Sequence, residues 1–93
     1  MTTAEAGRKQ VKFEFKGNPG SQVFVGGTFN GWKPKKAKLW DRKGDGVYTT
    51  RLLLALGKHE YKFIVDGTWS IDPTCSESNP DGHGGINSVV TVG

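Results

Sequence analysis

Residues 59–71 read His59-Glu60-Tyr61-Lys62-Phe63-Ile64-Val65-Asp66-Gly67-Thr68-Trp69-Ser70-Ile71. Before the turn, Tyr61, Phe63 and Val65 fall on one side of an extended chain, as the two-residue period of a β-strand requires. Lys62 falls on the opposite side, which we expect to face solvent. Asp66-Gly67 is a preferred two-residue hairpin turn. The stretch therefore predicts a β-hairpin whose return strand covers residues 68–71.

Similar strand-like runs occur on both sides of this hairpin, and turn-forming residues separate them. The expected strands cover residues 11–16, 23–25, 48–54 and 86–92, with irregular segments over 28–46 and 72–85. An apolar pattern typical of an amphipathic helix is absent from the sequence. We therefore expect an all-β, immunoglobulin-like antiparallel sandwich of about seven strands.

The length and composition fit one small domain. The chain has 93 residues, of which 34% are hydrophobic and 24% charged. We expect residues 1–10 to form a flexible arm and residues 11–93 to form the folded module. The longest apolar run, residues 52–56, is far shorter than the roughly 20 residues of a membrane span. A signal-peptide stretch is absent and Cys75 is the single cysteine, so the sequence predicts a cytoplasmic protein. Isolated modules of this size are usually monomers, so we expect a monomer, and we expect no membrane partner.

Residue patterns for catalysis or metal binding are weak. The loop with Asp41 and Asp45 lacks the ligands that a calcium-binding loop needs at its third and twelfth positions, which are Lys43 and Leu52 here. Cys75 and His83 are eight residues apart and have no second ligand pair, which is not zinc spacing. The sequence therefore predicts a protein that is not an enzyme and has no catalytic residues, cofactor or metal.

Four lysines lie close together between two tryptophans: Lys33, Lys35, Lys36 and Lys38 follow Trp32 and precede Trp40. A lysine-rich stretch of this kind is most often a solvated loop. The alternative is a basic patch with aromatic platforms that binds nucleic acid, in keeping with the net charge of +4. We favour the solvated loop and do not expect a nucleic-acid partner.

The tryptophans indicate a binding surface. Trp32 lies in a turn-like segment that cannot bury an indole well, and Trp69 follows the hairpin tip, near Lys62. Indoles stack on the C–H faces of sugar rings, while lysine and amide groups meet the hydroxyl edges. A sugar-binding platform is one interpretation, and ordinary half-buried surface tryptophans are the other.

Three stretches resemble a known family. Residues 23–32 read Val23-Phe24-Val25-Gly26-Gly27-Thr28-Phe29-Asn30-Gly31-Trp32. This segment, the run from Gly57 to Pro73 and the closing run from Gly85 to Val92 resemble the motifs of carbohydrate-binding module family 48. That family includes the glycogen-binding domain of the AMP-activated protein kinase beta subunit and the N-terminal domain of isoamylases. The likeness covers residues 11–92 and implies the same β-sandwich fold.

The resemblance implies non-catalytic binding of α-1,4-linked glucan such as glycogen or starch, which targets a partner or an associated enzyme to the polymer. It assigns Trp32 and Trp69 as stacking platforms, Lys62 as a hydroxyl donor and Asn87 as a polar anchor. His83 stands where kinase-type modules carry a leucine that threads into the curve of the glucan. The loop around His83 is rich in glycine, so we expect it to be flexible and to need ordering around a ligand.

A second function remains open for the same fold. Leu53 and Leu56 are expected to form an exposed apolar patch, through which the module could dock a kinase or a glycan-active enzyme while its sugar binding is vestigial.

Overall fold

The computed structural model describes residues 7–93, which form eight strands and contain no helix. The strands are β1 (Arg8–Lys16), β2 (Val23–Gly27), β3 (Ala37–Leu39), β4 (Val47–Ala55), β5 (Gly57–Val65), β6 (Thr68–Ser70), β7 (Ser78–Pro80) and β8 (Ile86–Val92). In this part of the chain no helix is long and apolar enough to cross a membrane.

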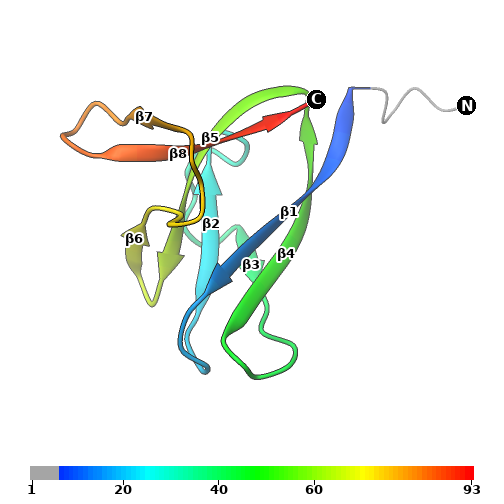
Figure 1. The fold of residues 1–93 in the computed structure, drawn as a ribbon, viewed down its shortest axis with the longest axis vertical. Coiled ribbons are helices and arrows are strands. Elements are labelled where there is room, and N and C mark those ends of the chain that lie inside the picture. Colours follow the sequence, from blue (N-terminus) through cyan, green and yellow to red (C-terminus); the bar gives the residue numbers. More distant parts are fainter. Residues whose placement is uncertain (1–6) are drawn as a thin grey trace, which may run out of the picture.

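The strands form two antiparallel layers (Figure 1). One layer is the long antiparallel pair of β1 and β4, and the other is a six-stranded sheet in the order β3-β2-β5-β8-β7, with β6 also paired to β5. The Asp66-Gly67 turn joins β5 to β6 with positive φ at both residues, 49° and 85°, as a tight hairpin turn requires. The expected all-β antiparallel sandwich is confirmed, with eight strands in place of about seven.

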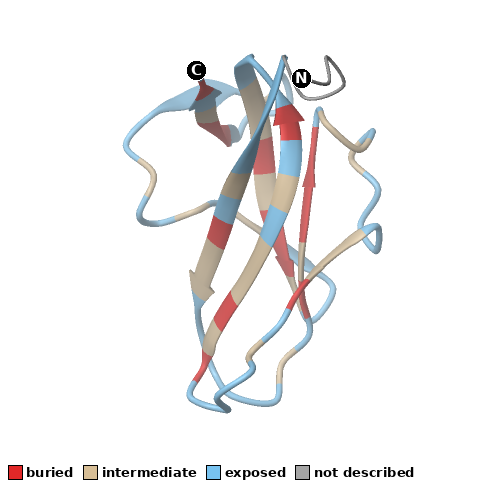
Figure 2. Ribbon diagram, turned by 90° about the vertical axis from the view of Figure 1, so that its right-hand side faces the viewer, coloured by how far each residue is buried: buried red, intermediate tan, exposed pale blue. Residues whose placement is uncertain are grey.

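The core lies between the two layers. Phe13, Tyr48 and Leu54 contribute from the small layer, and Phe63, which is fully buried, lies at the centre of the large one. In Figure 2 the buried residues lie mainly on strands, whereas exposed residues dominate the connecting loops. Because Tyr61 and Phe63 point into this core, Glu60 and Lys62 on the same strand face outward.

The structure differs from the sequence prediction in two edge strands and at the N-terminal boundary of the module. Strands β3 and β7 lie in segments expected to be irregular, because short edge strands are set by backbone pairing to a neighbour rather than by side-chain alternation. The proposed boundary between residues 10 and 11 falls inside β1, where Arg8 pairs with Ala55. The rest of the expected N-terminal arm, residues 1–6, lies outside the described residues.

Candidate functional site

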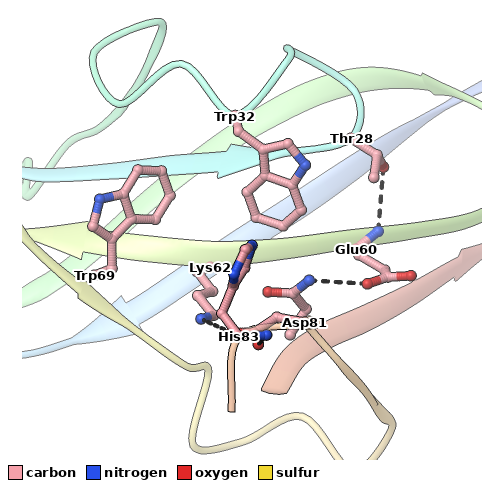
Figure 3. Close-up of a pocket in the computed structure, with 8 residues that line it drawn as sticks. Thr28, Trp32, Glu60, Lys62, Trp69, Asp81 and His83 are labelled. Atoms are coloured by element: carbon pink, nitrogen blue, oxygen red, sulfur yellow. Dashed lines mark hydrogen bonds and ion pairs between the residues drawn. The ribbon is translucent and has the colours of Figure 1, made fainter. Parts of the chain in front are cut away.

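An open pocket of about 430 Å³ lies on the outward face of the six-stranded sheet (Figure 3). Its lining residues are Thr28, Trp32, Glu60, Lys62, Trp69, Asp81, His83 and Asn87. They come from the segment after β2, from β5, β6 and β8, and from the loop between β7 and β8. All five residues singled out from the sequence are therefore brought together in one pocket.

Trp32 is presented by a tight turn at the end of β2. The backbone N–H groups of Asn30 and Trp32 both donate to the carbonyl of Gly27, at 3.1 and 2.9 Å. The Asn30 side chain accepts from Gly27 N–H and donates to the Val25 carbonyl, which fixes the turn to the strand. Trp32 itself has φ of 61°, a left-handed conformation that is uncommon for a bulky residue and costs about 1–3 kcal/mol. The turn therefore holds Trp32 in a backbone conformation that local preference disfavours, and its indole lines the pocket.

Trp69 forms the second aromatic wall of the pocket. It lies on β6, where its register partner on β5 is Ile64, and it remains 42% exposed. Its six-membered ring lies over Gly26, where an added Cβ would come within 3.0 Å of the ring. The centroids of Trp32 and Trp69 are 6.3 Å apart and their planes are inclined by 51°. The two indoles thus form a bent aromatic surface.

Lys62 and Asp81 form a shielded ion pair in the pocket. The Lys62 ammonium lies 3.0 Å from Asp81 Oδ2, and the side chains are 20% and 13% exposed. Asp81 Oδ1 also accepts from the backbone N–H groups of His83 and Gly85, at 2.7 and 3.0 Å. The pKa of Asp81 is lowered to about 2 by the hydrogen bond from the His83 N–H, by the Lys62 ammonium and by the hydrogen bond from the Gly85 N–H. Asp81 is therefore a fixed anion that orients Lys62 and holds the β7–β8 loop.

Asn87 and Glu60 form a second polar pair. Asn87 is 7% exposed, and its side-chain amide donates to Glu60 Oε1 at 2.9 Å. The backbone N–H of Glu60 donates in turn to the hydroxyl of Thr28, at 3.2 Å. The pairing fixes the Asn87 amide at the pocket wall, beside a carboxylate that can accept further hydrogen bonds.

His83 lies at the open side of the pocket. Its side chain is exposed, and Figure 3 shows it rising from the β7–β8 loop toward the Trp32 indole. Its backbone, by contrast, is tied down by Asp81. The loop that we expected to be flexible thus has a defined hydrogen-bonded form.

Three lining residues were missed from the sequence: Thr28, Glu60 and Asp81. Glu60 could have been found, because it lies two positions before Lys62 and so shares its face of β5. Asp81 gave no signal, since its contact with Lys62 spans 19 residues and depends on how the β7–β8 loop folds back.

Other residues considered from the sequence lie elsewhere. Asp41 accepts from the backbone N–H groups of Gly44, Asp45 and Gly46 and so closes a turn. Within residues 7–93, no group of three or more histidine, cysteine, aspartate or glutamate side chains is placed to hold a metal ion. Trp40 lies outside the pocket, with the Lys38 ammonium 4.4 Å from its ring centroid.

The arrangement suits a neutral, polyhydroxylated ligand. Aromatic faces offer contact area to C–H groups, and the ammonium, amide and carboxylate groups around them offer donors and acceptors for hydroxyls. Comparison with known proteins agrees with this chemistry: the model of the family described as the glycogen recognition site of AMP-activated protein kinase matches residues 9–93. The chain belongs to this family. The family assignment made from the sequence motifs is thereby confirmed, and so is the carbohydrate-binding character of the domain.

Relatives of this glycogen-recognition domain occur in plants and animals. It is 37% identical over 75 residues to protein FLOURY ENDOSPERM 6, chloroplastic, of Oryza sativa subsp. japonica, which covers 81% of this chain and 13% of the relative. It is 36% identical over 85 residues to phosphoglucan phosphatase LSF1, chloroplastic, of Arabidopsis thaliana, covering 89% of this chain and 14% of the relative. It is 40% identical over 55 residues to 5'-AMP-activated protein kinase subunit beta-2 of Homo sapiens, covering 59% and 19%. The matched region is thus less than a fifth of each of these proteins.

The comparisons contradict the expected cytoplasmic location. Both plant relatives are named as chloroplastic proteins, which points to a plastid. The prediction rested on a missing apolar stretch, which argues only against a secretory signal. Plastid transit segments are instead amphipathic and rich in serine and arginine, so the absence of an apolar stretch carries no information about them.

Proposed function

We propose that this domain binds α-1,4-linked glucan in the pocket lined by Trp32 and Trp69, and so targets an associated protein to glycogen or starch. The observation that carries the proposal is the convergence of five residues from separate elements. Trp32, Lys62, Trp69, His83 and Asn87 all line the same pocket.

Each residue has a role that follows from its position. The two inclined indoles suit a ligand that curves, and α-1,4-linked glucans curve along their length. Lys62 gives one of its three N–H donors to Asp81 and keeps the others for sugar hydroxyls. Asn87 has one amide hydrogen bonded to Glu60 and retains its carbonyl and its second N–H for the ligand. His83 lies at the open side of the pocket, where its imidazole can contact the ligand.

The expected affinity is modest. If each indole loses about 100 Å² of apolar surface to a sugar, each contributes about 2.5 kcal/mol at 25 cal/mol per Å². Association absorbs several kcal/mol of this gain. Hydrogen bonds from Lys62 and Asn87 add about 1 kcal/mol or more each. The sum corresponds to a dissociation constant of about a millimolar for an oligosaccharide, and to tighter apparent binding to a polymer through avidity.

The proposal is for a domain without catalytic activity. The pocket holds two carboxylates, Glu60 and Asp81, and glycoside hydrolysis generally uses such a pair. A general acid, however, needs a raised pKa, whereas the pKa of Asp81 is lowered to about 2. Asp81 would thus stay ionised and could not protonate a leaving group, and both carboxylate oxygens of Glu60 already accept from the side-chain amides of Asn87 and Asn79.

The partner is proposed from the names of the proteins that contain related domains. One relative is named as a kinase subunit and another as a phosphoglucan phosphatase. We infer that this domain, as a monomer, holds a kinase or a glucan-active enzyme on the polymer.

The exposure of Leu53 and Leu56, at 46% and 50%, favours the alternative in which an apolar patch docks the partner. A Leu56→Asp variant that loses partner binding but keeps glucan affinity would support docking through this patch. If that variant kept its partner, the alternative would be excluded.

Calorimetric titration with maltoheptaose tests glucan binding. The native domain is expected to release heat on titration, and a Trp32→Ala, Trp69→Ala double variant is expected to release none. Trp40→Ala is the matched control, because it removes an exposed indole that lies outside the pocket. Equal binding by the folded double variant and the native domain would place the glucan elsewhere and overturn the assignment.

A further inference from the structure

A second pocket lies on the other side of Trp69 and has no role in the site described above. It has a volume of about 280 Å³ and is lined by Gln22, Phe24, Pro34, Lys35, Ile64, Gly67 and Trp69. Trp69 lines both pockets, so its indole is the wall between them. A ligand that stacks on Trp69 in the first pocket therefore lies next to the second pocket.

The two pockets are built from the same pair of segments. On one side, the segment after β2 gives Trp32 to the first pocket and Pro34 and Lys35 to the second. On the other side, the β5–β6 hairpin gives Trp69 to both and Gly67 to the second. The pockets are therefore successive parts of one groove that runs between the Trp32 segment and the hairpin.

The floor of the second pocket is apolar and firmly held. Phe24 and Ile64 are register partners on β2 and β5, so they lie side by side on the outward face of the sheet. The hairpin is anchored beside them, because Gln22 N–H donates to Asp66 Oδ1 at 2.9 Å and Asp66 N–H donates to the Gln22 carbonyl at 2.8 Å. Ile64 is almost fully buried, so the exposed apolar surface here comes mainly from Phe24 and Trp69, and it can receive the C–H face of a pyranose ring.

The rim of the second pocket carries polar groups suited to hydroxyls. Lys35 is exposed and, within the described residues, takes part in no ion pair, so its ammonium is available to a ligand. The Gln22 side-chain amide can both donate and accept. The combination of an apolar floor and polar rim repeats, in weaker form, that of the first pocket.

We propose that the second pocket is an additional glucan subsite, which binds the glucose units that continue past Trp69 from the first pocket. This inference rests on the proposed function. It makes the domain selective for longer α-1,4-glucan chains over short ones, because only a chain that bridges Trp69 contacts both pockets at once.

Two adjacent lysines provide the matched test. Lys35 lines the second pocket, whereas Lys36 lines a separate depression with Phe29 and Leu53. Lys35→Ala and Lys36→Ala remove the same charge from the same exposed turn, so they differ only in the surface that each lysine contacts. Phe24→Ala removes the floor of the subsite, and a thermal melt checks that this variant is folded.

Calorimetry with maltotriose and maltoheptaose measures the effect. The native domain is expected to bind maltoheptaose more tightly than maltotriose. Lys35→Ala should weaken maltoheptaose binding about fivefold, as the loss of one hydrogen bond does, and Phe24→Ala about tenfold. Both variants should bind maltotriose like the native domain, and Lys36→Ala should be unchanged with both sugars.

Failure of this inference differs from failure of the proposed function. If Lys35→Ala and Phe24→Ala leave maltoheptaose binding unchanged while Trp32→Ala abolishes it, the subsite is excluded and the first pocket stands. Equal losses for Lys35→Ala and Lys36→Ala would also exclude the subsite, since they would show a general charge effect. An absence of binding by the native domain to either sugar would overturn both proposals.

Discussion

Asp81 is the residue on which the organisation of the pocket depends most. Its carboxylate holds the Lys62 ammonium and two backbone N–H groups, and it needs Gly85 to do so. A Cβ on Gly85 would come within 2.7 Å of Asp81 Oδ2, and Gly82 and Gly84 adopt left-handed φ of 81° and 87°. The glycines that led us to expect a flexible loop let the chain wrap around this carboxylate.

A pH titration tests the role of Asp81. Its pKa in the folded protein, about 2, lies below the usual carboxyl value near 4, so the stabilisation that it gives is complete above about pH 4. This stabilisation is lost progressively as the pH falls from about 4 through about 2. We therefore expect the amide resonance of Gly85 to stay constant in NMR spectra from about pH 5 to about pH 3, a range below that in which histidine side chains change charge.

The control is Asp81→Asn, which should shift this amide resonance at neutral pH and weaken maltoheptaose binding. A transition of the native Gly85 amide near pH 4 would show that Asp81 is an ordinary exposed carboxylate.

At the scale of elements, the end of β2 couples the fold to the pocket. Gly26 and Gly27 are both buried, yet they face different neighbours. Gly26 lies beneath the Trp69 ring, and Gly27 lies against the Glu60 carbonyl of β5 and the Phe29 ring. One glycine therefore leaves room for a binding side chain, and the other lets two backbones approach.

Alanine should weaken ligand binding at Gly26 and lower the stability of the fold at Gly27. In Gly26→Ala, the added Cβ meets an indole that can move, so we expect a folded domain with about tenfold weaker maltoheptaose binding, equal to about 1.4 kcal/mol. In Gly27→Ala, the Cβ meets a backbone carbonyl that cannot move, so we expect a loss of about 1–3 kcal/mol in the free energy of unfolding. Denaturant unfolding and calorimetry on both variants measure the two effects. Unaltered maltoheptaose affinity in Gly26→Ala would show that the position of Trp69 is not important for binding.

At the scale of the whole molecule, charge separates glucan binding from nucleic-acid binding. The net charge is +4, and the lysine-rich segment between Trp32 and Trp40 is mostly exposed. Part of this basic character is used within the protein, because the Lys38 ammonium lies over the rings of Trp40 and Phe24. The site proposed for glucan, by contrast, pairs its lysine with Asp81 and receives a neutral ligand.

Salt dependence should therefore be weak for the proposed ligand. The dissociation constant of maltoheptaose is expected to change less than about twofold between roughly 50 and 500 mM salt, because screening acts on charge–charge attraction and the sugar carries no charge. Binding through released phosphate counterions would instead weaken linearly on a logarithmic salt scale. Titrations with maltoheptaose and with a single-stranded oligonucleotide, over the same salt series, distinguish the two. Tight oligonucleotide binding with such a slope, together with no maltoheptaose binding, would favour the nucleic-acid alternative.

The long strands and the central hairpin could be predicted because their information is local. Alternation in β5 fixed which face Tyr61 and Phe63 bury and which face Lys62 exposes, and Asp66-Gly67 fixed the turn. Edge strands β3 and β7 could not be predicted in this way. The alternation in β3 covers only Ala37, Lys38 and Leu39, which is too short to predict a strand, and β7 is Ser78-Asn79-Pro80, which has no such alternation. Both strands exist because a paired neighbour supplies backbone hydrogen bonds.

The sequence by itself determined the fold class, the family and the types of residue available for binding, since these follow from periodicity and short motifs. Tertiary packing, in contrast, brings Trp32, Trp69 and Asn87 together in one pocket. It also places Asp81 and Glu60 where they hold the polar groups of that pocket, and it sets Trp69 at the border of a second pocket. The physical reason is distance along the chain. Local patterns set which face of a strand each side chain takes, whereas pairing between strands far apart in sequence sets which of those faces become neighbours.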